Sequence, residues 1–372
     1  MTWEQVVSLA ALLVAVVAAV VGVLVLRRLA AAQRRVPTIA PQHAEDQGDR
    51  PPLGPAAIIV NPTKVTQPAS LQQTLRELSA ELGLPEPLWF ETSVEDPGHG
   101  QALQAMAAGA SVVIAAGGDG TVRSVAGALA STSTPMGLLP LGTGNLLARN
   151  LDLPLEAGTR ALLTTALIGT EHPIDLAWLR TERTGSPPDD VVEPGSPEEH
   201  VFLVAGGVGF DAAMVAGADE QLKARMGWLA YFVAGVQHLH GRRIRLTMQV
   251  DDQPAVPLRL RSLVFANCGR LPGGMVLLPD AEINDGWLDI AALDARGGLF
   301  GWASLFGKVL LQGLGVRRDL PGQPGSIEFW RGRTVTVRCE EPQQIQLDGD
   351  LIGEAIGLQV RVQPGSLLIR TR

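Results

Sequence analysis

Two glycine-rich segments are the parts of this chain best suited to hold phosphate. The first, Gly117–Thr121, reads GGDGT, and the second, Leu141–Asn145, reads LGTGN. Each follows a short apolar run and leads into a helical pattern, so each is predicted to join a strand to a helix. Such a turn leaves backbone N–H groups free beside the positive end of a helix dipole. Two such turns in one small domain predict a nucleotide held by its phosphates.

Asp119, in the first segment, carries a charge that a polyphosphate would repel. The carboxylate is favourable there if Mg²⁺, or a water on Mg²⁺, lies between it and the phosphates. The alternative is a structural turn in which Asp119 caps a helix. Neither segment has a Walker A lysine or an intact GxGxxG spacing, which excludes an ordinary P-loop and a dinucleotide fingerprint.

Strand patterns alternate with helical patterns around both segments. The first helical pattern has Ser70 as its expected N-cap, with Gln73 completing a capping box. Alternating elements with short links predict a parallel sheet covered on both faces, with ligands beyond the carboxyl ends of its strands. The apolar runs read as strands are 56–60, 88–91, 112–116 and 136–139.

The chain changes character after residue 152, where strand-like runs at 244–250, 258–267 and 334–338 predict antiparallel structure. The expected fold class is therefore an α/β nucleotide-binding domain, a parallel sheet with helices on both faces, plus a β-rich antiparallel second domain. An N-terminal transmembrane helix completes the predicted fold.

The N-terminal run from Val6 to Leu26 has no charged residue, and about 20 apolar residues cross ~30 Å of hydrocarbon. Glu4 precedes the run and Arg27 and Arg28 follow it, so the positive-inside rule places the N-terminus outside. A cleaved signal peptide, the alternative, needs a basic n-region and a shorter apolar core. We therefore expect a single-pass protein of the cell membrane with its catalytic domains in the cytoplasm.

These patterns divide the chain into segments. A β-rich domain is expected to carry an acidic loop at 181–199, and a C-terminal segment is a candidate to pack back on the α/β domain. The predicted segments are an anchor at 1–28, a linker at 29–54, the α/β domain at 55–152, the β-rich domain at 153–354 and the C-terminal segment at 355–372.

Composition excludes one class of partner. A formal net charge of −8 and a pI near 5.3 argue against a nucleic-acid binder. Cys268 and Cys339 lie far apart without metal-ligand spacing, which indicates thiols in a reducing compartment. The sequence carries no signature of oligomeric state, and a homodimer stays open.

Six motifs follow one another along the chain: GGDGT at 117–121, PLGTGN at 140–145, GVGFDA at 207–212, a Gly-Gly-Met turn within 267–279, NDGWLD at 284–289 and LDGD at 347–350. Taken in order, they resemble the diacylglycerol kinase catalytic family, which includes bacterial lipid kinases and the sphingosine and ceramide kinases. The resemblance covers residues 55–372. It implies an enzyme that uses ATP and Mg²⁺ to phosphorylate the hydroxyl of a membrane lipid, with diacylglycerol converted to phosphatidic acid as the default.

The resemblance also implies roles for single residues. Mg²⁺ would be held by the Asp285 carboxylate with backbone carbonyls of Glu282 and Trp287. The family's proton acceptor ends an Asp-Gly-Glu motif and corresponds to Asp350, so Asp350 and Asp119 are the expected catalytic residues. The ATP site would comprise Asn61, Pro62, Thr92, Gly117, Gly118, Asp119, Gly120, Thr121, Gly142, Thr143, Gly144 and Asn145.

The chain departs from the family pattern at three places. Thr63 and Lys64 stand where relatives often have Ser-Gly, and Leu146 stands where many have aspartate. Asp350 is one methylene shorter than glutamate. Because a general base must reach within ~3 Å of its proton or act through a water, the role could pass to Asp348. The alternative for Asp348-Gly349-Asp350 is a type I′ hairpin turn.

Other functions stay open at this point. The acceptor could be a sphingoid base or another lipid alcohol, because these need the same phosphate machinery. A soluble-substrate kinase of the NAD kinase type would explain the first glycine segment alone. A catalytically weak nucleotide-binding regulator at the membrane is a third reading, suggested by Leu146 and Asp350. The aromatic-rich stretch 299–314 is either a membrane-facing helix or a core helix.

Overall fold

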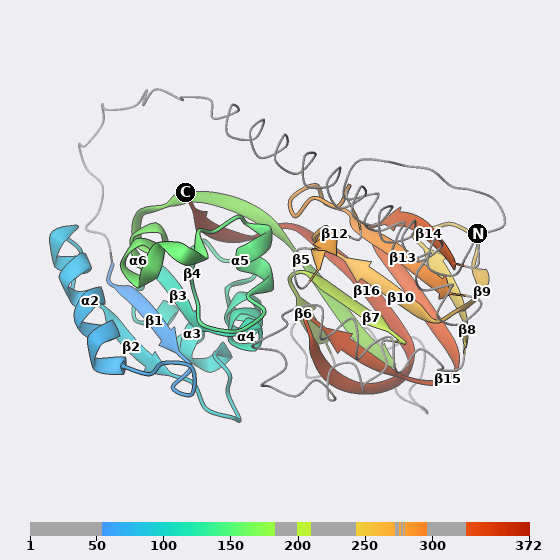
Figure 1. Ribbon diagram of the computed structural model, residues 1–372, viewed down its shortest axis with the longest axis horizontal. Helices are drawn as coiled ribbons and strands as arrows, with labels where there is room; N and C mark the ends of the chain where they lie inside the picture. The colour runs from blue at the N-terminus through green and yellow to red at the C-terminus, as the bar shows by residue number, and fades with distance from the viewer. Residues whose placement is uncertain are drawn as a thin grey trace, which may run out of the picture. The chain divides into compact units, whose positions relative to one another are not determined.

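A parallel sheet of four strands forms the first part of the fold (Figure 1). β1 (Ala56–Val60) pairs with β2 (Leu88–Glu91) on one side and with β3 (Val112–Gly117) on the other, and β3 pairs with β4 (Met136–Pro140). β1 and β3 are buried along their whole lengths, as expected for parallel strands covered on both faces. The computed structural model describes residues 54–182, 199–209, 243–271, 275–276, 278, 280–295 and 325–372.

Helices cover both faces of this sheet. On one face, Ile58 and Ile114 pack with α2 (Pro68–Glu81) and α6 (Gly158–Ile168). On the other face, Ile59 packs with α3 (His99–Ala107) and α4 (Asp119–Leu129). Successive strand residues therefore face opposite cores, and the predicted α/β architecture is confirmed.

The predicted N-cap of α2 is wrong. The helix begins at Pro68 with Gln67 as its N-cap, and no side chain caps it. Proline suits the first helical position because its φ is already helical and the N–H it lacks would have had no intrahelical partner. Ser70 is inside the helix, where its carbonyl accepts a hydrogen bond from the Thr74 hydroxyl at 2.9 Å.

The second part of the fold is rich in antiparallel strands. β10 (Ser262–Ala266), for example, pairs antiparallel with both β13 (Leu288–Ala295) and β7 (Ala205–Val208). The run 258–267 is divided at Arg261, because its first half pairs with β8 (Ile244–Val250) and its second half with β13 and β7. The strands are β5 (Thr170–Glu182), β6 (Glu199–Phe202), β7 (Ala205–Val208), β8 (Ile244–Val250), β9 (Val256–Leu260), β10 (Ser262–Ala266), β13 (Leu288–Ala295), β14 (Gly325–Gly332), β15 (Thr334–Leu347) and β16 (Asp350–Thr371), with a short pair of β11 (Arg270–Leu271) and β12 (Met275–Val276).

β16 connects the two kinds of sheet. It pairs antiparallel with β15 and β5, and its end pairs in parallel with β4 through Ile369 and Met136. Apart from β11 and β12, which form a separate two-stranded sheet, the described strands of both parts thus belong to one 14-stranded sheet. Because Leu53–Arg372 forms one compact unit, the division at residues 152 and 153 stays a prediction.

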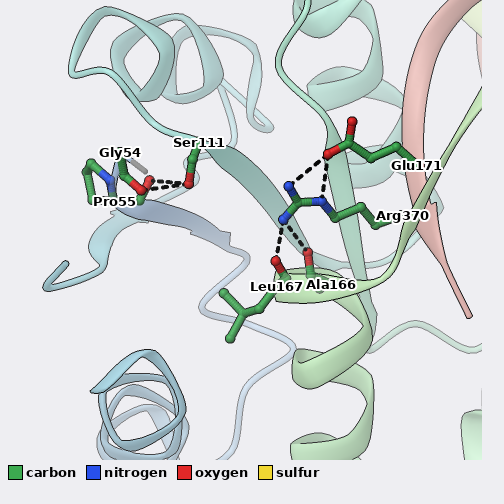
Figure 2. A network of polar contacts seen from close by, with 7 residues as sticks. All are labelled: Gly54, Pro55, Ser111, Ala166, Leu167, Glu171 and Arg370. Atoms are coloured by element: carbon green, nitrogen blue, oxygen red, sulfur yellow. Dashed lines mark hydrogen bonds and ion pairs between the residues drawn. The ribbon is translucent and has the colours of Figure 1, made fainter. Parts of the chain in front are cut away.

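Arg370, near the end of β16, is held by a polar network (Figure 2). Its Nη2 lies 2.9 Å from Glu171 Oε1, and its Nη1 donates to the carbonyls of Ala166 and Leu167 in the last turn of α6. The last carbonyls of a helix have no intrahelical N–H donor, and the guanidinium donates to them here. Its positive charge also interacts favourably with the negative end of the helix dipole. Figure 2 also shows the Ser111 hydroxyl donating to the Gly54 carbonyl at 2.6 Å, beside the start of β1.

The predicted location in the cell membrane needs correction. Within the ranges that the structure describes, no helix has the length and apolar character needed to cross a bilayer. This finding overturns the expected single-pass location. The run from Val6 to Leu26, most of the acidic loop 181–199 and the apolar stretches 222–239 and 299–314 lie outside the described residues.

A tight contact between β4 and α6 gives a stability prediction. A Cβ added to Gly137 would lie 2.6 Å from the Ala166 Cβ and 3.0 Å from its Cα. We expect Gly137→Ala to lower the free energy of unfolding by about 1–3 kcal/mol through overpacking, measured by urea unfolding. In Gly137→Ala/Ala166→Gly the lost methyl makes room for the new one, so the double variant should be more stable than the sum of the two single effects. Strict additivity would contradict the contact.

Candidate functional site

The register of the parallel strands brings four strand ends to one edge of the sheet. Val60 is paired with both Glu91 and Ala116, and Gly117 is paired with Pro140. Backbone hydrogen bonds continue just past these pairs, from the Thr92 amide to the Val60 carbonyl at 2.9 Å and from the Leu141 amide to the Gly117 carbonyl at 2.8 Å. The predicted nucleotide residues therefore follow their strands at the edge where ligands bind in such sheets.

Asn61 orders the turn after β1. Its amide donates to the Ala116 carbonyl at 2.9 Å, and its Oδ1 accepts hydrogen bonds from the Thr63 amide at 3.0 Å and hydroxyl at 2.7 Å. The turn includes Pro62 and closes with the Lys64 amide donating to the Asn61 carbonyl at 3.0 Å. These hydrogen bonds hold the turn against the end of β3, which leads into the first glycine segment.

The two glycine segments contact each other directly. A Cβ on Gly142 would lie 2.8 Å from Gly118 Cα, and a Cβ on Gly144 would lie 2.6 Å from Asp119 Oδ2. Larger residues at these positions would separate the segments, so glycine serves close approach here.

Asn145 closes the second segment on itself. Its Oδ1 accepts from the Gly142 amide at 2.9 Å and its Nδ2 donates to the Gly142 carbonyl at 2.8 Å. The residue has φ 48°, in the left-handed region that asparagine tolerates better than most side chains.

Asp119 joins the two segments. Its Oδ2 accepts from the Asn145 amide at 3.0 Å and its Oδ1 from the Leu146 amide at 2.6 Å, so it caps α5 (Leu146–Asn150). Asp119 is therefore the first residue of α4 and also caps α5, the next helix along the chain. Leu146, which is buried, contributes its amide to this contact.

Burial raises the pKa of Asp119 to about 6. The amides of Leu146 and Asn145 oppose the shift, whereas the negative charges of Asp348 and Asp350 add to it. Three carboxylates from two distant parts of the sequence thus interact at this edge of the sheet.

The first turn of α4 is a suitable anion site. Gly118 is its N-cap and no side chain caps the helix. The first amides of an α-helix have no intrahelical acceptor, and here they lie at the positive end of the dipole. The chemistry of this turn fits a phosphate.

The β15–β16 hairpin brings Asp350 to the first glycine segment. Leu347 pairs with Asp350, and the two residues between them, Asp348 and Gly349, have φ 48° and 97°. Two residues with positive φ fit the predicted type I′ turn. Asp350 Oδ2 lies 3.3 Å from the position that a Cβ on Gly120 would take. Asp348 and Gly349 therefore form the hairpin turn, and the same hairpin places Asp350 beside the first glycine segment.

Asp348 holds the hairpin rather than facing outward. Its buried carboxylate accepts hydrogen bonds from the amides of Leu203, Val204 and Ala205 at 2.9, 2.9 and 3.0 Å. Burial raises the pKa of Asp348, against the opposing effects of Arg123 and these amides. With both oxygens bonded to backbone, Asp348 is engaged in fixing the hairpin to the segment between β6 and β7.

The residues expected to hold Mg²⁺ have a different set of neighbours. Asp285 forms an ion pair with Arg331 and accepts from the Trp287 amide at 3.0 Å, while Glu282 is exposed. The adjacent Gly286 amide donates to the buried Asp175 at 2.6 Å. None of the polar contacts described for these residues reaches the glycine segments, and no group of three or more ligand side chains occurs among the described residues.

Arg123 belongs to the site although the sequence did not single it out. Its Nη2 donates to Asp350 Oδ2 at 2.8 Å and its Nη1 to the Leu347 carbonyl at 2.7 Å. An arginine one turn after a glycine segment is a weak signal, because exposed arginines are common on helices. Its partner lies 227 residues further along the chain.

Comparison with known proteins accounts for most of the described chain. The diacylglycerol kinase catalytic domain matches residues 55–179, and the YegS C-terminal NAD kinase beta sandwich-like domain matches residues 204–371. A protein of Pseudomonas putida named probable lipid kinase YegS-like is 32% identical over 269 residues, which cover 71% of this chain and 78% of that protein.

A second relative and a solved structure are also similar to this chain. A protein of the same name from Pseudomonas aeruginosa strain PAO1 is 31% identical over 274 residues, covering 72% of this chain and 78% of its own. The crystal structure of a diacylglycerol kinase from Bacillus anthracis covers 87% of this chain and 99% of its own, with a TM-score of 0.64 and 19% identity. The latter match supports the fold.

The raised pKa of Asp119 predicts a pH dependence of stability. Because the folded chain keeps a proton on Asp119 up to about pH 6, whereas an unfolded aspartate loses it near pH 4, the free energy of unfolding falls as pH rises between these values. Asp119→Asn lacks this titration. We therefore expect the stability of the wild type relative to Asp119→Asn to fall between about pH 4 and about pH 7 in urea unfolding.

A matched control is Leu147→Ala, which removes a buried side chain from α5 without removing a carboxyl. The stability difference between this variant and the wild type should stay flat over the same pH range. A flat or rising difference for Asp119→Asn would show that the Asp119 pKa is not raised.

Proposed function

The chain belongs to the diacylglycerol kinase catalytic family and is a lipid kinase, and from this premise we propose that it transfers the γ-phosphate of ATP to diacylglycerol. A sphingoid base or another lipid alcohol is the next candidate acceptor, because each offers the same hydroxyl chemistry. The observation that supports the proposal most is the contact between the two glycine segments, with Asp350 beside the first.

The phosphates of ATP are proposed to bind at the first turn of α4. The amides of that turn would donate hydrogen bonds to the phosphates. The second glycine segment, held in place by Asp119, would form the other side of the phosphate site. Asn61, Pro62 and Thr92 follow neighbouring strands at the same edge and would border the rest of the nucleotide.

Mg²⁺ is proposed to accompany ATP. It usually binds through one or two carboxylates together with substrate phosphates and water, so Asp119, in the phosphate turn, fits such a site directly or through a water on the ion. When bound, the ion would neutralise charge developing on the transferred group. A second proposed site for Mg²⁺ is the Asp285 carboxylate with the backbone carbonyls of Glu282 and Trp287, where Asp285 would exchange its pairing with Arg331 for the ion.

Asp350 is the proposed proton acceptor. Its side chain is 54% exposed at the open edge of the site, whereas both Asp348 oxygens are bonded to backbone amides. The hydroxyl of the lipid would give its proton to the Asp350 carboxylate, while the oxygen of that hydroxyl bonds to the γ-phosphorus. The bond from that phosphorus to the β–γ bridging oxygen breaks, and ADP leaves with the electron pair.

Labelled ATP tests the proposal. The purified chain, incubated with γ-labelled ATP, Mg²⁺ and a total lipid extract, should transfer label to organic-extractable lipid, and mass spectrometry of the product should identify phosphatidic acid. Asp350→Asn should lower the rate by about 10²–10⁴-fold, the usual contribution of a general base. Arg160→Gln, which removes an exposed ion pair with Glu81, is the matched control and should leave the rate unchanged.

Other outcomes would redirect the assignment. Label on another lipid would replace diacylglycerol as the acceptor, and label on NADP in a parallel reaction with NAD in place of lipid would contradict a lipid substrate. ATP binding without turnover on any lipid would favour a regulatory protein instead. Full activity of Asp350→Asn would remove this residue from the mechanism.

A further inference from the structure

Arg123 bridges the helix of the first glycine segment and the hairpin that carries Asp350. Its guanidinium donates to two acceptors, the Leu347 carbonyl at 2.7 Å and Asp350 Oδ2 at 2.8 Å. These two residues are paired across the hairpin turn. The guanidinium therefore spans the turn and holds both of its sides to α4.

The exposure of the two partners differs. The Arg123 side chain is only 18% exposed, whereas that of Asp350 is 54% exposed. An exposed aspartate on a turn is free to take several rotamers. The guanidinium selects the rotamer in which the carboxylate lies beside Gly120, in the first turn of α4.

The charges nearby give Arg123 a second effect. Asp119, Asp348 and Asp350 repel one another, and the charges of Asp348 and Asp350 help to raise the pKa of Asp119. Arg123 acts in the opposite direction on Asp348, whose pKa it lowers. The cation thus offsets part of the negative charge of Asp348 and Asp350 at the place where phosphate is proposed to bind.

An ordinary surface ion pair would have little effect. Exposed pairs contribute about 0–1 kcal/mol and are readily replaced by water. Arg123 differs because it is mostly buried and because its fork is matched to two fixed acceptors, a geometry that lysine cannot reproduce.

We infer that Arg123 is a positioning residue for phosphoryl transfer, which holds the Asp350 carboxylate at the first glycine segment in the orientation needed to accept the proton. This inference rests on the proposed function, in which Asp350 is the acceptor.

A double-mutant cycle on the full chain tests the inference. The variants are Arg123→Gln, Asp350→Asn and the double variant, with Arg160→Gln as control, and each is assayed for lipid phosphorylation at varied ATP. Arg123→Gln should lower kcat by about 10–100-fold, the scale of a misplaced catalytic group, with KM for ATP changed by less than about 3-fold. In the Asp350→Asn background the same change should cost less than about 3-fold, because the group that Arg123 positions is already lost.

Arg123→Lys keeps the charge but not the fork, so its kcat should lie between those of the wild type and Arg123→Gln. It also serves if Arg123→Gln fails to fold, since thermal unfolding of each variant separates lost stability from lost positioning.

Several results would overturn the inference. They are an unchanged kcat in Arg123→Gln, an equal loss in both backgrounds, or a raised KM for ATP at constant kcat, which would make Arg123 a nucleotide ligand. In each of these cases an inactive Asp350→Asn leaves the proposed function standing. If Asp350→Asn is fully active, the proposed proton acceptor and the inference fail together.

Discussion

The Asp119 carboxylate accepts hydrogen bonds from the amides of Asn145 and Leu146, and the site depends on this interaction more than on any other. The residue begins one helix and caps the next, so two turns that leave different strands become a single unit. Gly118 and Gly142 lie in close contact, and the hydrogen bonds from the second segment to Asp119 hold them there. A site for phosphate then needs no dedicated cationic side chain, since oriented amides supply the partial positive charge.

The same arrangement concentrates negative charge. Asp119, Asp348 and Asp350 come from two regions of the sequence, and burial raises the pKa of the first two. Such crowding is costly for stability alone and is typical of sites that bind cations or move protons. Backbone amides around Asp348 and the guanidinium of Arg123 offset part of the repulsion.

Local patterns in the sequence predicted the local parts of the fold. The strands 56–60 and 88–91 and the position of the glycine segments follow from hydrophobic runs and glycine chemistry, which act over a few residues. Pro68 and Ser70 are both typical of helix starts, and α2 begins at Pro68, so the prediction of Ser70 as the N-cap was wrong. Arg123 and the bonds of Asp348 could not be predicted, because their partners are more than 140 residues away and only the assembled sheet brings them together.

β16 has a consequence for how the fold is completed during synthesis. It follows every other described strand in the chain, yet its residue Ile369 pairs with Met136 on β4. Until β16 has left the ribosome, β4 presents an unpaired strand edge, the kind of surface on which chains aggregate. The α/β part therefore cannot finish its sheet early, and contacts of such long sequence separation slow folding. A chaperone that shields this edge would be of most use in the interval before β16 is made.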